Sequence, residues 1–516
     1  IKELANVIDN SKKVFDTSIK RVENKEFYPL SPAQKRMYFL SELSKENTAY
    51  NMPILLELSG NIKEEKIKNT LTSLIERHEI LRTSFIKVGE EIKQKINKEV
   101  KLDFEVIKVS SKNINLNNYI KAFDLSKAPL MRVKLFKVNE TESLLFIDMH
   151  HIISDGISMN IIMSEFSKIY KGEVLEKLKI RYVDYCEYIN NLDLQKEKEY
   201  WLKEFSEDIP VLELPLDFNR PQLQESEGNL LDFIIDKEVK DEVKSLAIES
   251  ETSEFMVLIS VFSLLLRRYS RQDNIVIGTP IAGRPNKDVE NVMGLFVNTL
   301  PLRFSIDLNS SYLDYLKSVK DKCLKAYENM LYPFDELVDE LNIPRNLSRN
   351  PLFDVMFVMQ NMKKEKIDLQ DFSMKEVENK KVVSKFDLTF IVEEREDYYV
   401  LSVEYAKSLF KDESIEYLIK HYVNLLKQVV KNKNLKLKDF SMLDKAERKL
   451  LEDFNESKAS YDLNTNIIKI FEKQAAKTPL NIALQSSDGE VTYKELNNRV
   501  NILGKKLRKE GVKKGT

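Results

Sequence analysis

The chain has 516 residues, a length that predicts two to four structural units rather than one small core. Its 81 basic and 83 acidic residues nearly cancel, so the formal net charge of −2 gives no electrostatic reason to expect a nucleic acid or a membrane surface as a partner. Hydrophobic residues make up 42% of the chain, and 12 Gly and 14 Pro exclude collagenous and low-complexity classes. The composition therefore predicts a soluble protein with a large core.

The cysteines and the apolar runs indicate in which cellular compartment the protein is expected. Cys186 and Cys323 are too few and too far apart in sequence for a disulfide framework or a structural zinc site, which favours a reducing cytoplasm and no bound metal. The strongest apolar run, 255–266, is shorter than the roughly 20 residues that a bilayer span needs, so it predicts a buried helix. The chain begins without Met or a signal peptide, and we expect a piece of a longer cytoplasmic protein.

The spacing of apolar residues predicts a mixture of helices and strands in the first part of the chain. Residues 1–8 have helical spacing and precede a polar, lysine-rich linker. The elements expected after this linker are a helix over 31–43, a strand over 53–58, a helix over 64–77, strands over 83–86 and 143–149, a helix over 157–169 and a helical stretch over 182–205.

A proline-marked segment, 210–221, predicts the crossing between two lobes of similar size. The elements expected in the second lobe are the buried helix over 255–268, strands over 274–278 and 299–304, and helices over 312–330 and 415–430. Residues 439–464 are charged and lack periodicity, which predicts a second linker. Helices over 467–476 and 492–511 are expected after it.

Two of the four histidines, His150 and His151, are adjacent and follow a predicted strand. Successive side chains of a strand point to opposite faces, so only one of the pair can face a substrate. Histidine is the usual general base near neutral pH and is also common in hydrogen-bonded cores, so the pair alone leaves both interpretations open. Asp155 and Gly156 complete the sequence HHIISDG, in which a carboxylate stands beside a glycine that allows a tight turn into the next helix.

Asp155 either orients the imidazole or holds its loop through an ion pair. A buried aspartate needs a cation or several hydrogen-bond donors. Three arginines in nearby motifs are candidate partners: Arg77, Arg82 and Arg284. Exposure to solvent is the usual fate of an arginine, so the residues alone leave the partner open.

Six segments occur in a fixed order along most of the chain. They are 31–40 (SPAQKRMYFL), 77–85 (RHEILRTSF), 149–156 (MHHIISDG), 181–185 (RYVDY), 277–303 (IGTPIAGRPNKDVENVMGLFVNTLPLR) and 345–357 (RNLSRNPLFDVMF). Together they resemble the motifs of the condensation domain of nonribosomal peptide synthetases. HHxxxDG alone occurs in several acyltransferase families, whereas six motifs in order are highly specific.

The resemblance implies an α/β fold of two chloramphenicol acetyltransferase-like lobes, arranged as a V-shaped pseudo-dimer with a tunnel between them. It also implies a division of the chain. The expected parts are the end of a peptidyl carrier domain and a linker at 1–24 (with IKELANVI), a condensation domain at 25–450 with lobes at about 25–205 and 206–450, and a linker with the incomplete start of an adenylation domain (with VTYKEL) at 451–516.

The implied reaction is attack by the α-amine of an acceptor aminoacyl thioester on the carbonyl of a donor aminoacyl or peptidyl thioester. The substrates would arrive on the 4'-phosphopantetheine of upstream and downstream carrier domains, beside an adjoining adenylation domain, and the chain itself would bind no cofactor. A thioester is already activated, so no metal or covalent intermediate is needed. The protein then has to hold two tethered reactants together and manage a proton.

The resemblance also implies roles for the residues of HHxxxDG. His151 is expected to act, either by taking the proton from the attacking ammonium or by positioning the amine and stabilising the oxyanion. His150 is expected to pack beside it as a hydrogen-bonded neighbour. Gly156 is expected to let the donor arm pass close to the backbone, and its amide to contribute to an oxyanion site.

Asp155 is expected to be structural and to pair with Arg82, with Arg284 as the second candidate, while Arg77 completes the supporting set. The chain departs from the family where Asn329 replaces a usual histidine, with Asp335 beyond it, and we expect packing or a tunnel wall there. No role is assigned to His78 beyond its motif, and His421 is expected on a helix surface.

Three other kinds of domain share features with this chain. An epimerisation domain normally continues with a Trp-Arg helix start, whereas ISMNII follows Gly156, and heterocyclisation domains replace these histidines by carboxylates. A noncatalytic docking or recruitment domain would keep the fold, but the intact His151 and Asp155 argue against it. The segment SPAQKRMYFL looks more like domains that accept an L-configured donor. The sequence does not identify the donor and acceptor amino acids that would be joined.

Overall fold

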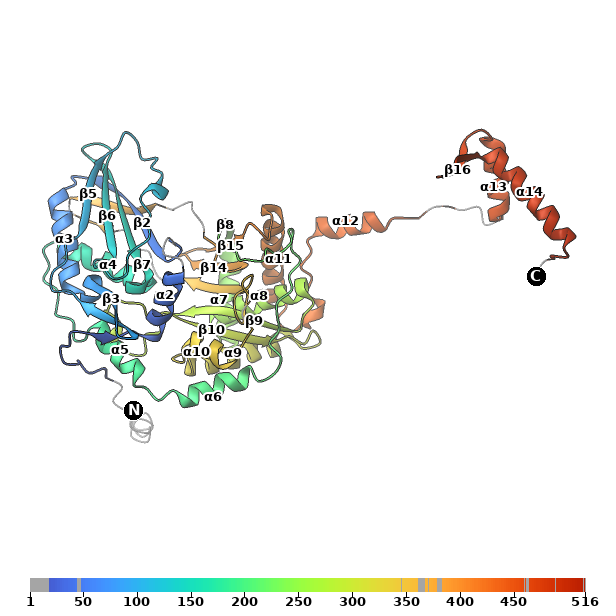
Figure 1. Cartoon of the computed structure of the whole chain (residues 1–516). Helices are drawn as coiled ribbons and strands as arrows, with labels where there is room; N and C mark the ends of the chain where they lie inside the picture. The colour runs from blue at the N-terminus through green and yellow to red at the C-terminus, as the bar shows by residue number, and fades with distance from the viewer. Residues whose placement is uncertain are drawn as a thin grey trace. The chain divides into compact units, whose positions relative to one another are not determined.

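A computed structural model of the chain describes residues 18–43, 48–344, 346–360, 367–369, 371–377, 383–458, 460, 464–487, 489–513 and 515. The chain divides into two compact units, Ile1–Asp444 and Lys445–Thr516, which are described separately (Figure 1). The helix expected over residues 1–8 lies outside the described residues.

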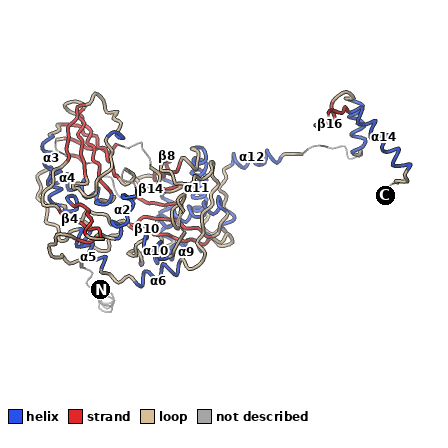
Figure 2. Tube along the Cα trace, viewed as in Figure 1, coloured by secondary structure: helices blue, strands red, loops and turns tan. Residues whose placement is uncertain are grey.

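The first unit contains two lobes, each built on a six-stranded sheet (Figure 2). In the N-terminal lobe the strand order is β12-β13-β2-β7-β6-β5. These strands are β2 (Asn51–Gly60), β5 (Asp103–Lys108), β6 (Met131–Lys137), β7 (Glu142–His150), β12 (Ile367–Asp368) and β13 (Phe372–Val377). The lobe's helices are α2 (Pro32–Leu43), α3 (Glu64–Arg77), α4 (Gly156–Tyr170) and α5 (Tyr182–Asn190). A smaller sheet joins β1 (Tyr28–Pro29), β4 (Glu91–Ile96) and β3 (Thr83–Val88).

The C-terminal lobe has the strand order β10-β9-β11-β14-β15-β8. These strands are β8 (Gly228–Ile235), β9 (Asn274–Ile281), β10 (Asn298–Ser305), β11 (Val355–Gln360), β14 (Leu388–Glu394) and β15 (Tyr399–Ala406). Its helices are α6 (Gln195–Glu204), α7 (Lys237–Glu249), α8 (Glu254–Ser270), α9 (Tyr312–Glu328), α10 (Phe334–Glu340) and α11 (Asp412–Lys431). The hydroxyl of Ser253 caps α8, and every residue from Met256 to Leu266 is buried, which confirms the predicted buried helix.

Two segments cross from the second lobe into the first. Strand β13 follows β11 in the chain, yet it pairs antiparallel with β2, with Phe372 opposite Gly60. The loop between β9 and β10 also enters the N-terminal core, where Leu295 and Phe296 are buried. Neither crossing was predicted, because a boundary near residue 206 assumes that each lobe is one continuous stretch of chain. The second crossing brings C-terminal residues next to HHIISDG, where the N–H of Phe296 donates to Asp155.

Two predicted elements need correction, and some strands were missed. The single helical stretch over 182–205 is two helices, α5 and α6, separated by the turn at residues 191–194. The stretch predicted as a linker over 439–464 contains the helix α12 (Lys445–Asn455). Several strands were not predicted at all, and β5 shows why: it lies at the sheet edge with mostly exposed side chains, so its sequence DFEVIK carries no apolar run.

The second unit consists of α12, α13 (Ile467–Lys477), the hairpin β16 (Ile482–Ser486) and β17 (Gly489–Thr492), and α14 (Tyr493–Lys509). A capping box starts α14, because Thr492 and Glu495 each accept a hydrogen bond from the other's backbone N–H. The predicted helices over 467–476 and 492–511 are thereby confirmed. Among the described residues of either unit, no helix is both long and apolar enough to cross a membrane.

Candidate active site

The segment HHIISDG forms the connection between β7 and α4. Strand β7 ends at His150, and residues His151–Ile153 form one turn of 3-10 helix. Asp155 is the N-cap of α4, where its side chain accepts the N–H of Ser158. The predicted strand end is confirmed, but the opposite-face argument for the two histidines was wrong, because His151 already lies outside the strand.

His151 is held by backbone groups on both sides. Its N–H donates to the carbonyl of Tyr50 at 2.9 Å, and its ring Nδ1 lies 2.7 Å from the carbonyl oxygen of Ser154. A carbonyl only accepts, so Nδ1 carries the proton and Nε2 keeps a lone pair, for which the described residues offer no hydrogen-bond partner. Burial, and after it the charge of Lys385, lowers the pKa of His151. The ring is therefore a neutral base at physiological pH.

His150 is a buried neighbour, as expected from the resemblance. Its Nδ1 accepts the N–H of Ile152 at 3.2 Å, which leaves Nε2–H to donate to the hydroxyl of Ser41 at 3.3 Å. The ring of Phe123 packs edge-on at 6.1 Å. Burial first, and the neighbouring His151 second, lower the pKa of His150 to about 3. This ring is neutral and fully engaged, so it supports the turn that carries His151.

The low pKa of His150 makes stability depend on pH. Between about pH 6.5 and pH 3 the unfolded chain binds a proton at this residue and the folded chain does not, so stability falls as the pH drops through this window. We expect His150→Gln to remove up to about 1.4 kcal/mol per pH unit of this dependence. Urea unfolding of parent and variant at pH 7.5, 5.5 and 4.5 measures the difference. Equal pH slopes for the two proteins would contradict the assignment.

Asp155 lies at the centre of a buried cluster. Its Oδ1 accepts from the N–H and the hydroxyl of Ser158, at 2.7 and 2.8 Å, and its Oδ2 accepts from the N–H of Phe296 at 3.2 Å. Nη2 of Arg284 donates to both oxygens, at 3.2 and 3.4 Å, and its guanidinium lies 4.0 Å from the ring centroid of Phe296. Arg284 also donates to the carbonyl of Val292 at 2.7 Å. The cluster ties HHIISDG to the loop that crosses from the C-terminal lobe.

The preferred pairing of Asp155 with Arg82 was therefore wrong, and the second candidate, Arg284, is the partner. Arg82 donates to the carbonyl of Asn97 at 2.8 Å and pairs with Glu79 at 3.2 Å. The Asp155 partner is set by the crossing of loop 284–296, which no local sequence pattern reveals. Only the N-cap bond had a sequence signal, since an aspartate directly before a predicted helix start is a favoured N-cap residue, whose side chain accepts a backbone N–H of the first turn.

Arg77 also lies apart from HHIISDG. Its Nε donates to Glu165 at 2.9 Å, and the same carboxylate oxygen lies 2.7 Å from Nε2 of the buried His78. This cluster joins the end of α3 to α4, the helix that Asp155 caps. Arg77 thus supports the site only through the packing of α4, and His78, which had no predicted role, does the same.

Gly156 is the first residue of α4, and its φ is outside the left-handed region, so the turn into this helix does not use the backbone freedom of glycine. A Cβ at this position would meet no heavy atom within 4 Å. The space beside Gly156 is therefore open.

Gln34 is a site residue that the sequence analysis missed. It lies in α2, is fully buried, and donates to the carbonyl of Ile152 at 3.2 Å, within the turn that begins at His151. Its amide also donates to Gln94 at 3.2 Å, whose own amide bonds the carbonyl of Pro29 at 2.8 Å. Polar residues in an amphipathic helix are usually solvated, so nothing local marked Gln34 as buried.

Two further expectations concern the C-terminal lobe. Asn329 is buried at the end of α9, where its carbonyl accepts the indole N–H of Trp201 at 2.9 Å, so it is a packing position. Asp335 on α10 pairs with Arg36 of α2 at 3.1 Å, a contact between the lobes. His421 was predicted on a helix surface, but it is buried and its Nδ1 lies 2.6 Å from the hydroxyl of Tyr269. That prediction was wrong because α11 packs on α8 along this face.

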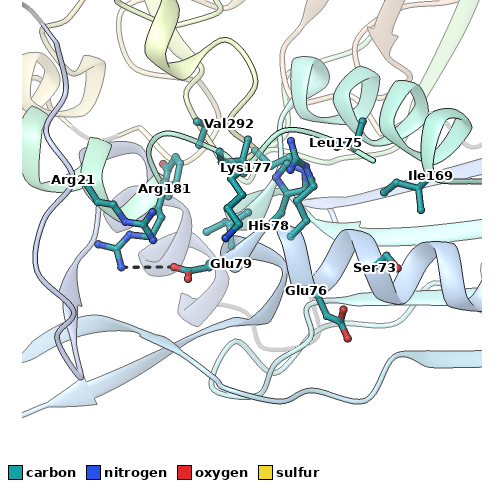
Figure 3. A pocket seen from close by; sticks show the side chains of 15 residues that line it. Arg21, Ser73, Glu76, His78, Glu79, Ile169, Leu175, Lys177, Arg181 and Val292 are labelled. Atoms are coloured by element: carbon teal, nitrogen blue, oxygen red, sulfur yellow. Dashed lines mark ion pairs between the residues drawn. The ribbon is translucent and has the colours of Figure 1, made fainter. Parts of the chain in front are cut away.

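A cavity of about 470 Å³ opens beside the motif RHEILRTSF rather than at His151 (Figure 3). Arg181 and Glu79 pair across it at 3.8 Å, while the side chains of Arg21 and Lys177 point toward the same space. Its lining contains no residue of HHIISDG. Among the described residues, no group of three or more His, Cys, Asp or Glu side chains is placed to hold a metal ion.

Sequence comparison finds relatives over the whole chain. The family model of the condensation domain matches residues 24–452. Tyrocidine synthase 3 of Brevibacillus parabrevis is 42% identical over 521 residues, covering 100% of this chain and 8% of that protein. Bacitracin synthase 2 of Bacillus licheniformis is 38% identical over 521 residues, covering 100% of this chain and 20% of that protein. The chain thus spans a fifth or less of these two relatives.

Solved structures share the fold. A four-domain nonribosomal peptide synthetase, holo-AB3403 bound to AMP and glycine, is 21% identical with a TM-score of 0.81, covering 96% of this chain and 40% of that chain. The complex of the X-domain and OxyB from teicoplanin biosynthesis is 22% identical with a TM-score of 0.76, covering 83% of this chain and 98% of that chain. These likenesses confirm the predicted two-lobed α/β fold.

Proposed function

Since the chain belongs to the condensation-domain family of nonribosomal peptide synthetases, we propose that it forms a peptide bond between two carrier-bound aminoacyl thioesters. The donor aminoacyl or peptidyl group would pass to the α-amine of the acceptor, and the donor thiol would leave. One observation carries the proposal: His151 presents a neutral Nε2 with a lone pair, while its Nδ1–H is fixed on the Ser154 carbonyl.

The geometry of His151 suits proton transfer. An attacking α-ammonium has to lose a proton, and Nε2 is the atom that can take it. The imidazolium so formed would be stabilised by the Ser154 carbonyl, which already accepts the Nδ1–H at 2.7 Å. Both carboxylate oxygens of Asp155 already accept hydrogen bonds, from Arg284, Ser158 and Phe296. In this proposal Asp155 therefore holds the loop and takes no proton.

The finer parts of the function belong to the same proposal. Both substrates would be carried on the 4'-phosphopantetheine of partner carrier domains, with an adenylation domain adjoining, as in multidomain synthetases. The donor would be L-configured, on the resemblance of SPAQKRMYFL. The domain boundaries 1–24, 25–450 and 451–516, and a cytoplasmic location, remain predictions.

Loaded carrier domains test the proposal. The chain is mixed with a donor carrier bearing an N-acetyl-L-aminoacyl or the matching D-aminoacyl thioester, and with an acceptor carrier bearing each proteinogenic amino acid in turn. Mass spectrometry of the acceptor carrier should show the dipeptidyl thioester, with the L-donor preferred. Inversion at the donor α-carbon without coupling would indicate an epimerisation domain. Carrier binding without either product would indicate a noncatalytic docking domain.

Gly156→Ala tests the path of the donor arm. A methyl group there meets no heavy atom and no left-handed φ, so we expect an unchanged melting temperature. If the arm passes over Gly156, the methyl group obstructs it, and kcat/KM for the carrier-bound donor falls while KM for the acceptor stays constant. Unchanged donor kinetics in the folded variant would show that the arm takes another route.

A further inference from the structure

The segment before β14 carries a lysine whose backbone is fixed on several sides. The carbonyl of Lys385 accepts from the side-chain amides of Gln224 and Asn350, both at 2.9 Å. The preceding residue, Ser384, donates its N–H to the carbonyl of Ser226 at 3.0 Å. Two residues later, Asp387 accepts from Arg220 at 2.9 Å. The main chain at Lys385 is therefore held in place by the C-terminal lobe.

The side chain of Lys385 reaches the other lobe. Its Nζ lies 4.9 Å from the ring centroid of Tyr50, in cation–π range. Tyr50 is the residue whose carbonyl accepts the N–H of His151 at 2.9 Å. Within the described part of the chain, no carboxylate oxygen lies within 4 Å of the Lys385 Nζ. The Lys385 ammonium, which has no paired carboxylate among these residues, thus contacts Tyr50, the residue that bonds the backbone of the proposed base.

The other charges around this pair are few. The charge of Asp155, itself paired with Arg284, raises the pKa of His151, while His151 lowers the pKa of the adjacent His150. Burial lowers the pKa of Lys385, the charge of Glu404 raises it, and that of Arg36 lowers it. After burial, the charge of Lys385 lowers the pKa of His151.

We propose that Lys385 is a positioning residue of the condensation reaction, which acts on His151 from the opposite lobe by placing its ammonium over the ring of Tyr50, the residue whose carbonyl holds His151. This inference rests on the proposed function. The positive charge keeps the ring unprotonated while the site waits for an acceptor. The same charge also lowers the pKa of the incoming α-ammonium. Because the pKa values of the amine and the imidazole are both lowered, the free energy of proton transfer from one to the other is not made less favourable. The oxyanion that then forms on the donor carbonyl is stabilised by the same charge.

Histidine NMR tests the electrostatic step without any substrate. The chain has four histidines, so labelled imidazole signals are few, and the His151 signal is identified by its loss in His151→Ala. In Lys385→Met we expect the His151 midpoint to rise by roughly half a pH unit or more, while Lys385→Arg keeps the parent value. Lys407→Met is the matched control, because Lys407 pairs with Glu227 in the same lobe.

An unchanged His151 signal in folded Lys385→Met, at every pH where parent and variant are both folded, would overturn the proposal. The carrier assay adds the catalytic readout: the acid limb of the kcat profile should move to higher pH in Lys385→Met and return in Lys385→Arg. A parent that makes no dipeptide at any pH would refute the proposed function and leave the NMR result valid. If Lys385→Met does not fold, the His151 NMR midpoint is compared between the parent and Lys385→Gln instead, and an unchanged midpoint overturns the proposal.

Discussion

Replacing His151 by alanine should lower the rate of dipeptidyl-carrier formation by about 10²–10⁴-fold, the usual contribution of a positioned general base. The variant removes the Nε2 lone pair together with the bond from Nδ1 to the Ser154 carbonyl. Because the site still holds both thioesters together, proximity should leave some residual turnover. Single-turnover formation of the product on the acceptor carrier is the measurement, with the melting temperature recorded in parallel.

His421→Gln is the matched control for this experiment. His421 is also a buried histidine with a hydrogen bond, to Tyr269, but it lies in the C-terminal core on α11. We expect this control to retain the parent rate whatever its stability. Parent-like turnover in a folded His151→Ala would contradict the assignment of the base. A loss that added imidazole restores would show that the missing group is the ring nitrogen.

Breaking the ion pair of Asp155 and Arg284 should produce the largest loss of stability. The carboxylate and the guanidinium side chains are 1% and 6% exposed, and removal of one partner of a buried pair costs about 3–5 kcal/mol because the other is left unpaired. We expect Asp155→Ala to lose this amount, and Arg284→Met to lose a similar amount. Urea unfolding gives the free energies. Asp155→Ala combined with Arg284→Met should cost less than the sum of the two, because no lone buried charge remains.

The exposed pair of Lys237 and Asp397 is the control for this cycle. It has a similar short contact, at 2.6 Å, but both side chains are more than half exposed. We expect no measurable shift of the unfolding midpoint in Lys237→Met. For Asp155, the contrary outcome is also informative. If Asp155→Asn unfolded like the parent while all condensation was lost, the carboxylate would take part in the chemistry instead of holding the loop.

Local elements were predicted well where apolar residues form a run or a helical stripe. The helix over 64–77 and the buried helix around 255–268 have the expected cores, because their periodicity follows from packing one face or all faces inward. The edge strand β5 and the exposed helix α12 were missed because few of their side chains are buried. The sequence of β5 contains no apolar run, and that of α12 was interpreted as part of a linker.

The candidate site divides in the same way. The strand end at His150 is a local feature and was predicted, whereas the turn at His151 and the cap at Asp155 are local features that the sequence analysis did not identify. The orientation of the His151 ring depends on a carbonyl three residues away, which is also local. What lay beyond prediction was every contact that spans the lobes, including Arg284 at 129 residues' separation.

By itself, the sequence determined the fold family, the position of the histidine pair and a near balance of charge that gives no electrostatic reason to expect a nucleic-acid partner. Only the tertiary structure decided that Arg284 rather than Arg82 neutralises Asp155, and that Lys385 stands beside the residue that holds His151. The physical reason is that secondary structure follows from neighbours a few residues apart. A buried ion pair or a cation between lobes is chosen by how distant segments cross, as β13 and the loop before β10 do.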